Sequence, residues 1–480
     1  MISAANEARH SVFKETGRPR LLSSTERDLI RLVHEPGFSR WLEQIKSIGG
    51  CAHPIYLAGY TTTRHVATGE VLRHYDTSTE PGGRMPVRCR NRRETRCPTC
   101  SYLHAGDTFH LVRSGLLGGK GISTEVLHHP RLFVTLTAPS FGSVHRASSA
   151  EPCRPRRDGA ACEHGRPFGC GQRHTDTDLV VGQPLCHDCY DYTGHALWHA
   201  SAGKLWNRYC HMIRRHLATA AGVTQSRLQE HLTVSFAKVA EYQKRGAVHF
   251  HAVIRLDGPE GPSSPPPLWA TTDLLSQAIR SAAALVEVRA PYSPATGERV
   301  IRWGEQLDVH TIRGDSFTES SAVSDSAVAA YVAKYVSKSV GDAGGIDYRI
   351  DDFNSIRLAP VNSHLRALMA TCWRLGGLQE LEALNLRAWT HTLGYRGHAL
   401  TKSRQYSTTY GALRAVRADF QVGDVLTAQS REAVTESTWR YVGSGHSPAE
   451  AEIAYGIAED LATLREIRRD LVTGGWDYAA

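Results

Sequence analysis

Two histidines lie one residue apart in an apolar run, His249 and His251 of the stretch AVHFHAVIRLDG. Residues two apart in a strand project from the same face, so both imidazoles point together while Phe250 points to the other side. If the preceding residues KRG form a hairpin loop, Glu241 opposes His249, and its carboxylate lies about 5 Å away on the same face. Two imidazoles and one carboxylate form an open site that suits Mg²⁺ or Mn²⁺ better than structural zinc. A one-residue slip of the strand register would turn Glu241 away.

A second pattern of side chains that could do chemistry is YVAKYVSKSV at 331–340. In it, Lys334 and Lys338 each follow a tyrosine by three residues. On a helix, Tyr331 and Tyr335 share a face one turn apart. Tyrosine can act as a covalent nucleophile, but its ordinary pKa of about 10 means that it must be activated. A metal-polarised phosphate with lysines nearby would activate it. Composition alone also fits a half-buried amphipathic helix, and the two histidines also fit a structural role.

Cysteines form a third pattern, because Cys97-x2-Cys100 and Cys186-x2-Cys189 have the spacing of zinc knuckles. Further candidate ligands lie around and between the knuckles: Cys89, Cys153, Cys162, His164, Cys170 and His174. These residues could fill one or two tetrahedral sites, but the sequence does not determine their pairing. One grouping joins the two knuckles to each other and leaves Cys89, Cys162, Cys170 and a histidine such as His164 for a second site. Cys51, Cys210 and Cys372 are interpreted as ordinary core residues.

The positive charge of the chain is unevenly distributed. The 480 residues carry a net charge of +8, and the stretch RMPVRCRNRRETR at 84–96 holds six arginines against one glutamate. Such density is typical of a surface that contacts phosphates, although a solvated loop has the same composition. The predicted DNA-binding residues are Arg88, Arg90, Arg92, Arg93 and Arg96 of this stretch, together with Arg245 of the hairpin loop.

The elements that must position these residues follow from periodicity and turn signals. Helical spacing covers 21–50, and two strands joined at Thr68-Gly69 are expected over 55–76. A helix is predicted at 101–118, and the C-terminal part contains helical segments, a basic Tyr-rich stretch at 393–420 and an amphipathic helix near 447–473. Between them the predicted elements are a strand at 131–138, a helix at 195–221, strands at 231–242 and 247–256, a helix at 269–287, a strand at 307–313 and a helix at 324–340.

This order predicts an α+β fold of the split βαβ (βαββαβ) type, with a four-stranded antiparallel sheet, helices on one face and the other face free for ligands. The predicted regions are an N-terminal helical and β region at 1–84, a zinc-binding module at 85–190 interrupted by the first core strand, the core at 191–345 and a mainly helical, basic region at 346–480. No apolar run is long enough to span a membrane, and no signal peptide is visible, so a cytoplasmic location is expected.

Several of these motifs together carry a resemblance. HFH on a strand, YVAKYVSK on a later helix and an upstream LFVTLTAPS resemble the three motifs of HUH endonucleases, in the order of rolling-circle replication initiators. The tandem-tyrosine helix resembles that of the single-stranded DNA coliphage initiator. The wider chain, including RCRNRRETRCPTC, PLCHDCYDY, QKRGAVHFHAVIRLDG and LGYRGHALTKSRQYSTTY, is similar to the RepSA-type initiators of actinobacterial plasmids and integrative elements. The resemblance covers about residues 50–420.

The resemblance implies a replication initiator that nicks one strand at a double-strand origin, forms a 5′-phosphotyrosyl intermediate and later rejoins the strands. It implies that His249 and His251 are metal ligands, that Tyr335 attacks first and that Tyr331 acts in the second strand transfer. Lys334 and Lys338 would hold phosphates or the phenolate. Members of the family draw a third ligand from a nearby strand, and Glu241 is assigned to that role from the hairpin register alone.

Two other functions share parts of this pattern. A tandem-tyrosine HUH transposase combines the same core with zinc knuckles, and a zinc-containing DNA-binding regulator without catalysis would need only the cysteines and arginines. The expected partners are the origin duplex and a single-stranded nick site, with a host helicase and polymerase. A helicase must be separate because no GxxxxGK[ST] loop is present in the sequence.

Overall fold

The computed structural model describes residues 22–148, 151–154, 161–313, 323–337, 340–422 and 433–474. Contacts between residues group the chain into two compact units. The smaller unit comprises Met1–Cys89, Arg96–Thr99 and Thr427–Ala480, and the larger comprises Arg90–Thr95 and Cys100–Leu426. The C-terminal residues thus belong to the same unit as the N-terminal ones. The predicted regions were consecutive stretches of the chain, so they did not include such a grouping.

The smaller unit is built on an antiparallel sheet in which β1 (Ile55–His65) pairs with β2 (Val71–Asp76), β3 (Met85–Val87) and β12 (Ala433–Ser444). The predicted pair of strands at 55–76 is confirmed, and Gly69 in the turn has φ 71°, which favours glycine. The helices of this unit are α2 (Ser24–Val33), α3 (Phe38–Ser47) and α11 (Pro448–Gly474). Strand β12 lies where mainly helix was predicted.

The larger unit contains a six-stranded sheet with the order β10-β9-β4-β6-β5-β11. Its central strands are β4 (Arg131–Leu136), β5 (Thr233–Tyr242), β6 (Val248–Asp257) and β9 (Leu307–Arg313), and each neighbouring pair among them is antiparallel. The short strands β10 (Val323–Ser324) and β11 (Leu400–Lys402) extend the two edges. The prediction of an antiparallel sheet in a mixed α and β chain is therefore confirmed.

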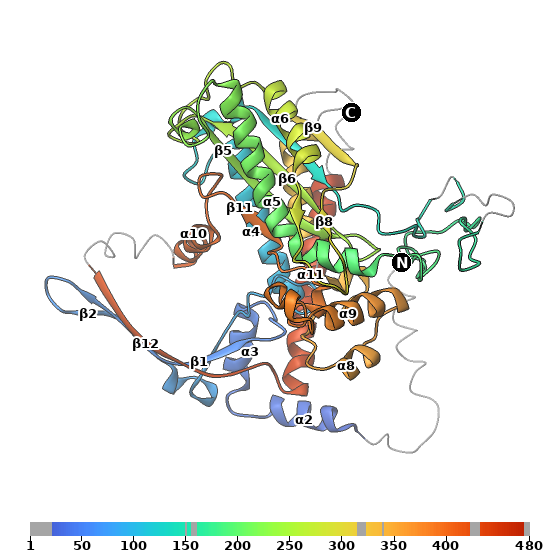
Figure 1. Ribbon diagram of the computed structural model, residues 1–480. Helices are drawn as coiled ribbons and strands as arrows, with labels where there is room; N and C mark the ends of the chain where they lie inside the picture. Colours follow the sequence, from blue (N-terminus) through green and yellow to red (C-terminus); the bar gives the residue numbers. More distant parts are fainter. Residues whose placement is uncertain are drawn as a thin grey trace. The chain divides into compact units, whose positions relative to one another are not determined.

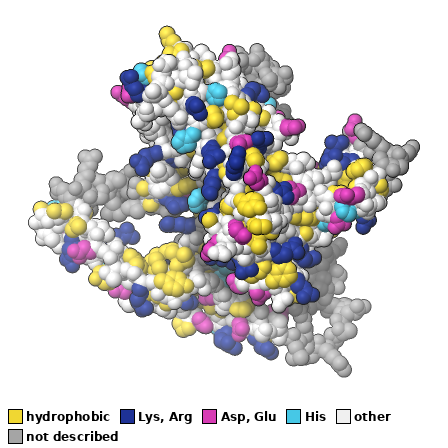
Figure 2. Space-filling view, viewed as in Figure 1, with side chains coloured by type: hydrophobic (Ala, Val, Ile, Leu, Met, Phe, Trp, Pro, Cys, Tyr) yellow, Lys and Arg dark blue, Asp and Glu magenta, His cyan; other side chains and the backbone are white. Residues whose placement is uncertain are grey.

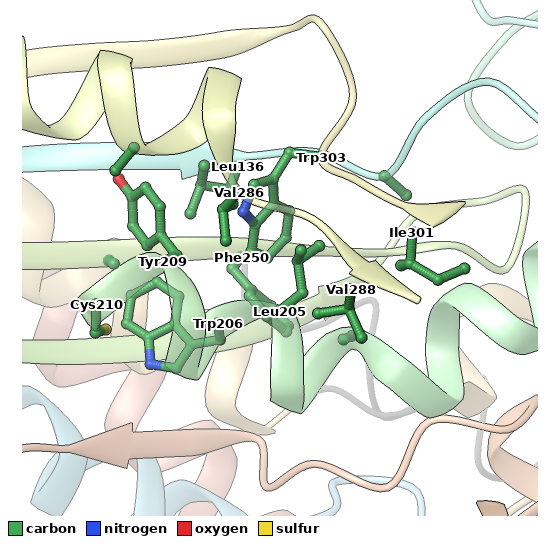
Figure 3. Packing of buried hydrophobic residues seen from close by; sticks show 14 of the residues in the cluster. Leu136, Leu205, Trp206, Tyr209, Cys210, Phe250, Val286, Val288, Ile301 and Trp303 are labelled. Atoms are coloured by element: carbon green, nitrogen blue, oxygen red, sulfur yellow. The ribbon is translucent and has the colours of Figure 1, made fainter. Parts of the chain in front are cut away.

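One face of this sheet packs against α5 (Tyr192–Ala220) and α6 (Thr272–Leu285), as Figure 1 shows for α5 beside β5 and β6. Alternate strand residues such as Leu136 and Phe250 point to this side, where they meet Leu205 and Trp206 of α5 (Figure 3). Burial of such large apolar side chains contributes roughly 1.5–3 kcal/mol each. This hydrophobic cluster fixes the sheet on which the candidate site lies.

The opposite face carries Phe133 and Val253, which pack against α4 (Pro98–Leu117) and α7 (Asp325–Ser337). The prediction that this face is free for ligands is therefore wrong for most of its length. The spacing of apolar residues predicts α4 and α7 as helices, but it does not indicate the sheet face on which their apolar sides pack. Toward the hairpin that joins β5 and β6, the face becomes polar.

That hairpin turns through the predicted KRG loop. Gln243 and Ala247 form the closing backbone hydrogen bond (2.8 Å), and Gly246 has φ 76°. A Cβ at Gly246 would also lie 2.9 Å from Leu393 Cδ1, so glycine is required both for the turn and for the space. The resulting register pairs Glu241 with His249, as the sequence predicted.

The remaining elements of the larger unit are β7 (Val288–Arg289), β8 (Val300–Ile301), α8 (Phe353–Leu358), α9 (Ser363–Leu375) and α10 (Tyr410–Val422). Within the described ranges, none of the helices combines the length and the apolar character needed to cross a bilayer.

Candidate active site and cysteine clusters

The side chains of Glu241, His249 and His251 converge on the polar end of the sheet. Glu241 Oε2 lies 3.0 Å from the Nε2 atom of each histidine, and the two Nε2 atoms are 3.2 Å apart. All three side chains are largely buried, with exposed fractions of 13%, 16% and 4%. These three atoms are close enough to one another to bind a single metal ion together.

Electrostatics and a neighbouring strand hold this group in place. Burial alone would raise the pKa of Glu241, but hydrogen bonds with His249 and His251 outweigh it and lower the pKa to about 2. Burial lowers the pKa of His251, which favours the neutral imidazole that can bind a metal. A hydrogen bond of 3.0 Å joins His251 Nδ1 to Thr135 Oγ1 of β4. Thr135 was not predicted, because its contact depends on the pairing of β4 with β6.

Both tyrosines of α7 face this group from above the sheet. Tyr331 Oη lies 3.2 Å from His251 Nε2, and the ring of Tyr335 stacks on that of His251 with centroids 6.0 Å apart. The two phenol rings are 4.5 Å apart, as expected for residues one helical turn apart. Burial raises the pKa of Tyr331. The structure thus brings the two sequence patterns, 80 residues apart, into one site.

Of the two lysines predicted for this site, the structure describes Lys334. Lys334 is exposed on α7, and its Nζ lies 5.7 Å from the centroid of the Tyr335 ring. Lys338 lies outside the described residues.

Two arginines contact α7 at its two ends, a feature that sequence reasoning missed. At the start of the helix, Arg131 of β4 binds Asp325 through both guanidinium nitrogens, at 3.0 and 3.1 Å, and both side chains are at most 5% exposed. At the far end, Arg92 donates to the carbonyl of Val336 (3.0 Å). Next to Arg131 in the sheet interior, Arg255 pairs with Asp257 at 2.6 Å. The contacts of Arg131 and Arg92 set the position of the tyrosine helix on the sheet.

Replacing Asp325 with Asn is expected to lower the stability of the larger unit by about 3–5 kcal/mol, because it leaves the buried Arg131 charge without its partner. Urea denaturation of the full chain measures this change. The matched control is Arg227→Gln, which breaks an exposed ion pair with Glu230 and is expected to leave the unfolding curve unchanged. An Asp325→Asn curve that overlays the wild type would contradict the anchoring role.

The cysteines form three clusters rather than the predicted grouping. The clusters are Cys51, Cys89, Cys97 and Cys100; Cys162, His164, Cys186 and Cys189; and His145, Cys153, Cys170 and His174. The proposed union of the two knuckles is wrong, because each knuckle instead pairs with ligands from other loops. Spacing identifies the local pair, but it does not reveal which distant loop completes it.

The structure also changes the interpretation of two individual residues, Cys51 and His145. Cys51 is not an ordinary core residue, because its Sγ lies 3.8 Å from Cys97 Sγ within the first cluster. His145 was missed because it stands alone in the sequence, without a second ligand at knuckle spacing. Cys210 and Cys372 are confirmed as core residues. The clusters could hold zinc, for which thiolate and imidazole are the usual ligands.

Most of the predicted DNA-binding arginines make contacts within the protein. Arg88 donates to the carbonyls of Ile48 and Ser47, Arg93 to that of Asp347, and Arg245 to those of Pro139 and Ala138. Arg92 caps α7 through the carbonyl of Val336. Arg90 is exposed and Arg96 is half-buried. In Figure 2, Lys and Arg side chains are scattered over the visible face rather than gathered on one segment.

Comparison with known proteins identifies the family of the chain. The sequence matches the family described as "RepSA: Replication initiator protein, pSAM2" over residues 37–459. A protein of Streptomyces ambofaciens named "Replication initiator protein" is 44% identical over 455 residues, which cover 93% of this chain and 95% of that protein. No solved structure matches the chain. The chain therefore belongs to the RepSA family of replication initiator proteins.

Proposed function

We propose that the chain initiates rolling-circle replication of a plasmid or integrative element by nicking one DNA strand at a double-strand origin through a tyrosine. The observation that carries this proposal is the meeting of Glu241, His249 and His251 with two phenols, one of which contacts His251 at 3.2 Å. Membership of a replication initiator family favours this function over transposition.

The sheet supports an HUH endonuclease core. The order β9-β4-β6-β5 with antiparallel neighbours is the arrangement expected when a strand, a helix, two strands, a helix and a strand follow one another in a split βαβ unit. HFH lies on the central strand β6, and the tyrosine helix packs on the face to which both histidines point.

The donor set fits a divalent cation. Two imidazole nitrogens and one carboxylate oxygen converge. Thr135 orients His251 through a hydrogen bond to Nδ1, the ring nitrogen that does not face Glu241. Glu241, His249 and His251 would hold Mg²⁺ or Mn²⁺, with coordination positions left for phosphate oxygens. When bound, such an ion polarises the scissile phosphate and offsets the charge that develops on it.

The protein groups then perform the transfer. The Tyr335 oxygen forms a bond to the phosphorus while the bond from phosphorus to the 3′ oxygen breaks, which leaves a 5′-phosphotyrosine and a 3′ hydroxyl. The phenol loses its proton and the departing 3′ oxygen gains one. Lys334, whose Nζ lies 5.7 Å from the centroid of the Tyr335 ring, would hold the phosphate or the phenolate in this scheme. Because the ester keeps the energy of the bond, a later attack by a 3′ hydroxyl rejoins the strand without ATP.

Tyr331 performs the second transfer in this scheme. Its oxygen is nevertheless the one that contacts His251, so the reverse order of the two tyrosines is the specific alternative. In the reverse order, Tyr331 would nick and Tyr335 would resolve.

We expect the DNA to present a single-stranded or extruded nick site, because the two phenols are half-buried and a flexible single strand reaches them more easily than a stiff duplex. Arg90, which is exposed, is the strongest remaining candidate of the arginine stretch for a phosphate contact. Host helicase and polymerase would unwind the duplex and extend the 3′ end.

The function is tested by incubating the chain with a supercoiled plasmid that carries the cognate origin and Mn²⁺. The proposal predicts an open circle with protein attached to its 5′ end. Binding of the plasmid without any nick would favour a non-catalytic regulator.

Replacing Thr135 with Ala is expected to raise the Mn²⁺ concentration for half-maximal nicking by about 10- to 100-fold, because His251 loses the group that orients it. A metal titration of nicking measures this effect. Thr233→Ala, at the far end of β5, serves as the control and should leave the titration unchanged. An unchanged midpoint for Thr135→Ala would contradict the orienting role.

A further inference from the structure

The segment between β4 and α5 is long and has little regular structure. In its described residues, 139–148, 151–154 and 161–191, no α-helix or extended strand occurs, only isolated bridges and turns. Loops of this length are uncommon in compact domains unless something besides secondary structure holds them. Yet Cys153 is fully buried and His174 is only 6% exposed. A local crosslink is therefore expected in this segment.

The cluster of His145, Cys153, Cys170 and His174 has the dimensions of such a crosslink. Around a tetrahedral zinc ion, two ligand nitrogens lie about 3.3 Å apart, and a nitrogen and a sulfur about 3.6 Å apart, given the usual bond lengths. The observed separation of His145 Nδ1 and His174 Nε2 is 3.2 Å. The sulfur to nitrogen separations are 3.3 Å for Cys170 and His174, and 3.9 Å for Cys153 and His145.

Groups around the cluster support its ligands. His174 Nδ1 lies 3.4 Å from a carboxylate oxygen of Asp178, an arrangement that orients an imidazole whose Nε2 binds zinc. The backbone N–H of Arg146 donates to Cys153 Sγ (3.1 Å) and fixes the position of the sulfur. Such contacts orient side chains that bind a metal, whereas a thiol that only packs in a core does not require them.

Backbone hydrogen bonds bring the two ligand-bearing loops together. Ser148 N–H donates to the carbonyl of His174 (3.0 Å), Cys153 N–H to that of Gln172 (2.7 Å), and Gly171 N–H to that of Arg154 (2.9 Å). The four ligands are thus presented from two paired loops, as in small zinc modules.

We propose that His145, Cys153, Cys170 and His174 bind a structural zinc ion that folds this segment, in addition to one ion in each of the other two clusters. Two sulfurs and two nitrogens in a tetrahedral set favour zinc over the hard cations that suit Glu241 and its histidines. The three clusters take nine of the eleven cysteines and leave the core residues Cys210 and Cys372.

The zinc ion would also shape a pocket near the candidate active site. Arg154 follows Cys153 directly and lines, with Gln243 and Gln306, a pocket of about 710 Å³. Gln243 lies two residues beyond Glu241, so the pocket is at the same end of the sheet. This consequence rests on the proposed function: a nucleotide of the single strand would enter the pocket. Loss of the ion should then raise the KM for a single-stranded origin oligonucleotide and leave kcat unchanged.

Zinc content is the primary test, because it does not depend on cleavage. Elemental analysis of the purified full chain is expected to give three zinc ions per chain. The double variant Cys153→Ser, Cys170→Ser should give two, and Cys153→His, which keeps a ligand at that position, should give three. The control Cys210→Ala removes a buried thiol outside the clusters and should also give three.

A double variant that keeps as much zinc as the wild type would overturn the proposal, as would a wild-type chain with only two ions. If the double variant does not fold, the wild-type count and the Cys153→His count still decide the question. A wild-type chain that holds three ions yet never nicks DNA would overturn the proposed function and leave the zinc site standing.

Discussion

Replacing Tyr335 with Phe is expected to abolish nicking of a supercoiled origin plasmid, with a loss on the order of 10⁴-fold or more, while duplex binding stays at the wild-type level. The substitution removes only the oxygen that would bond to phosphorus, and removal of a covalent nucleophile typically has an effect of this size. The ring and its stacking on His251 remain, so the fold is preserved. Gel analysis of nicked circles measures the loss, and a gel-shift assay measures the binding.

Two further tyrosine variants make this result interpretable. Tyr331→Phe should retain the first nick but fail to rejoin strands, because the second transfer has lost its nucleophile. Tyr292→Phe, at an exposed position 62% accessible to solvent, controls for the loss of a phenol oxygen elsewhere. Undiminished nicking by Tyr335→Phe together with none by Tyr331→Phe would reverse the assigned order.

Replacing both His249 and His251 with Ala should remove metal-dependent cleavage. Loss of one group that merely orients a ligand reduces metal affinity or activity by about 10- to 100-fold, so loss of two ligands should exceed 100-fold. Nicking across a Mn²⁺ titration, with and without EDTA, measures the effect.

The control for this pair is His211→Ala with His231→Ala, two exposed histidines away from the site. This control should nick like the wild type at every Mn²⁺ concentration. Wild-type cleavage that persists in EDTA would count against a metal at Glu241, His249 and His251.

The part of the site that depends on local geometry could be predicted from the sequence. The turn at Gly246 fixes the register of its hairpin, and the register places Glu241 opposite His249. Likewise, a spacing of four residues on a helix places Tyr331 and Tyr335 on one face. In both cases the partners are close in the chain, so the period of the strand or helix settles their orientation.

The features that could not be predicted depend on contacts between distant segments. The pairing of β12 with β1 joins residues more than 360 positions apart, and no turn signal records it. Arg131 and Asp325 belong to different elements, and neither residue alone carries a signal in the sequence. The predicted grouping of the cysteines was wrong for the same reason. Spacing in the sequence identifies residues that can be ligands, but the loop that completes each cluster is distant in the chain.

The central claim is that a phenol of α7 becomes covalently attached to DNA. Trypsin cleaves after Lys334 and so separates Tyr331, on peptide 314–334, from Tyr335, on peptide 335–338. After reaction with origin DNA, nuclease trimming and trypsin digestion, mass spectrometry is predicted to find the nucleotide adduct on peptide 335–338. An adduct on 314–334 would assign the first attack to Tyr331, and DNA that is nicked with no adduct on either peptide would contradict the account.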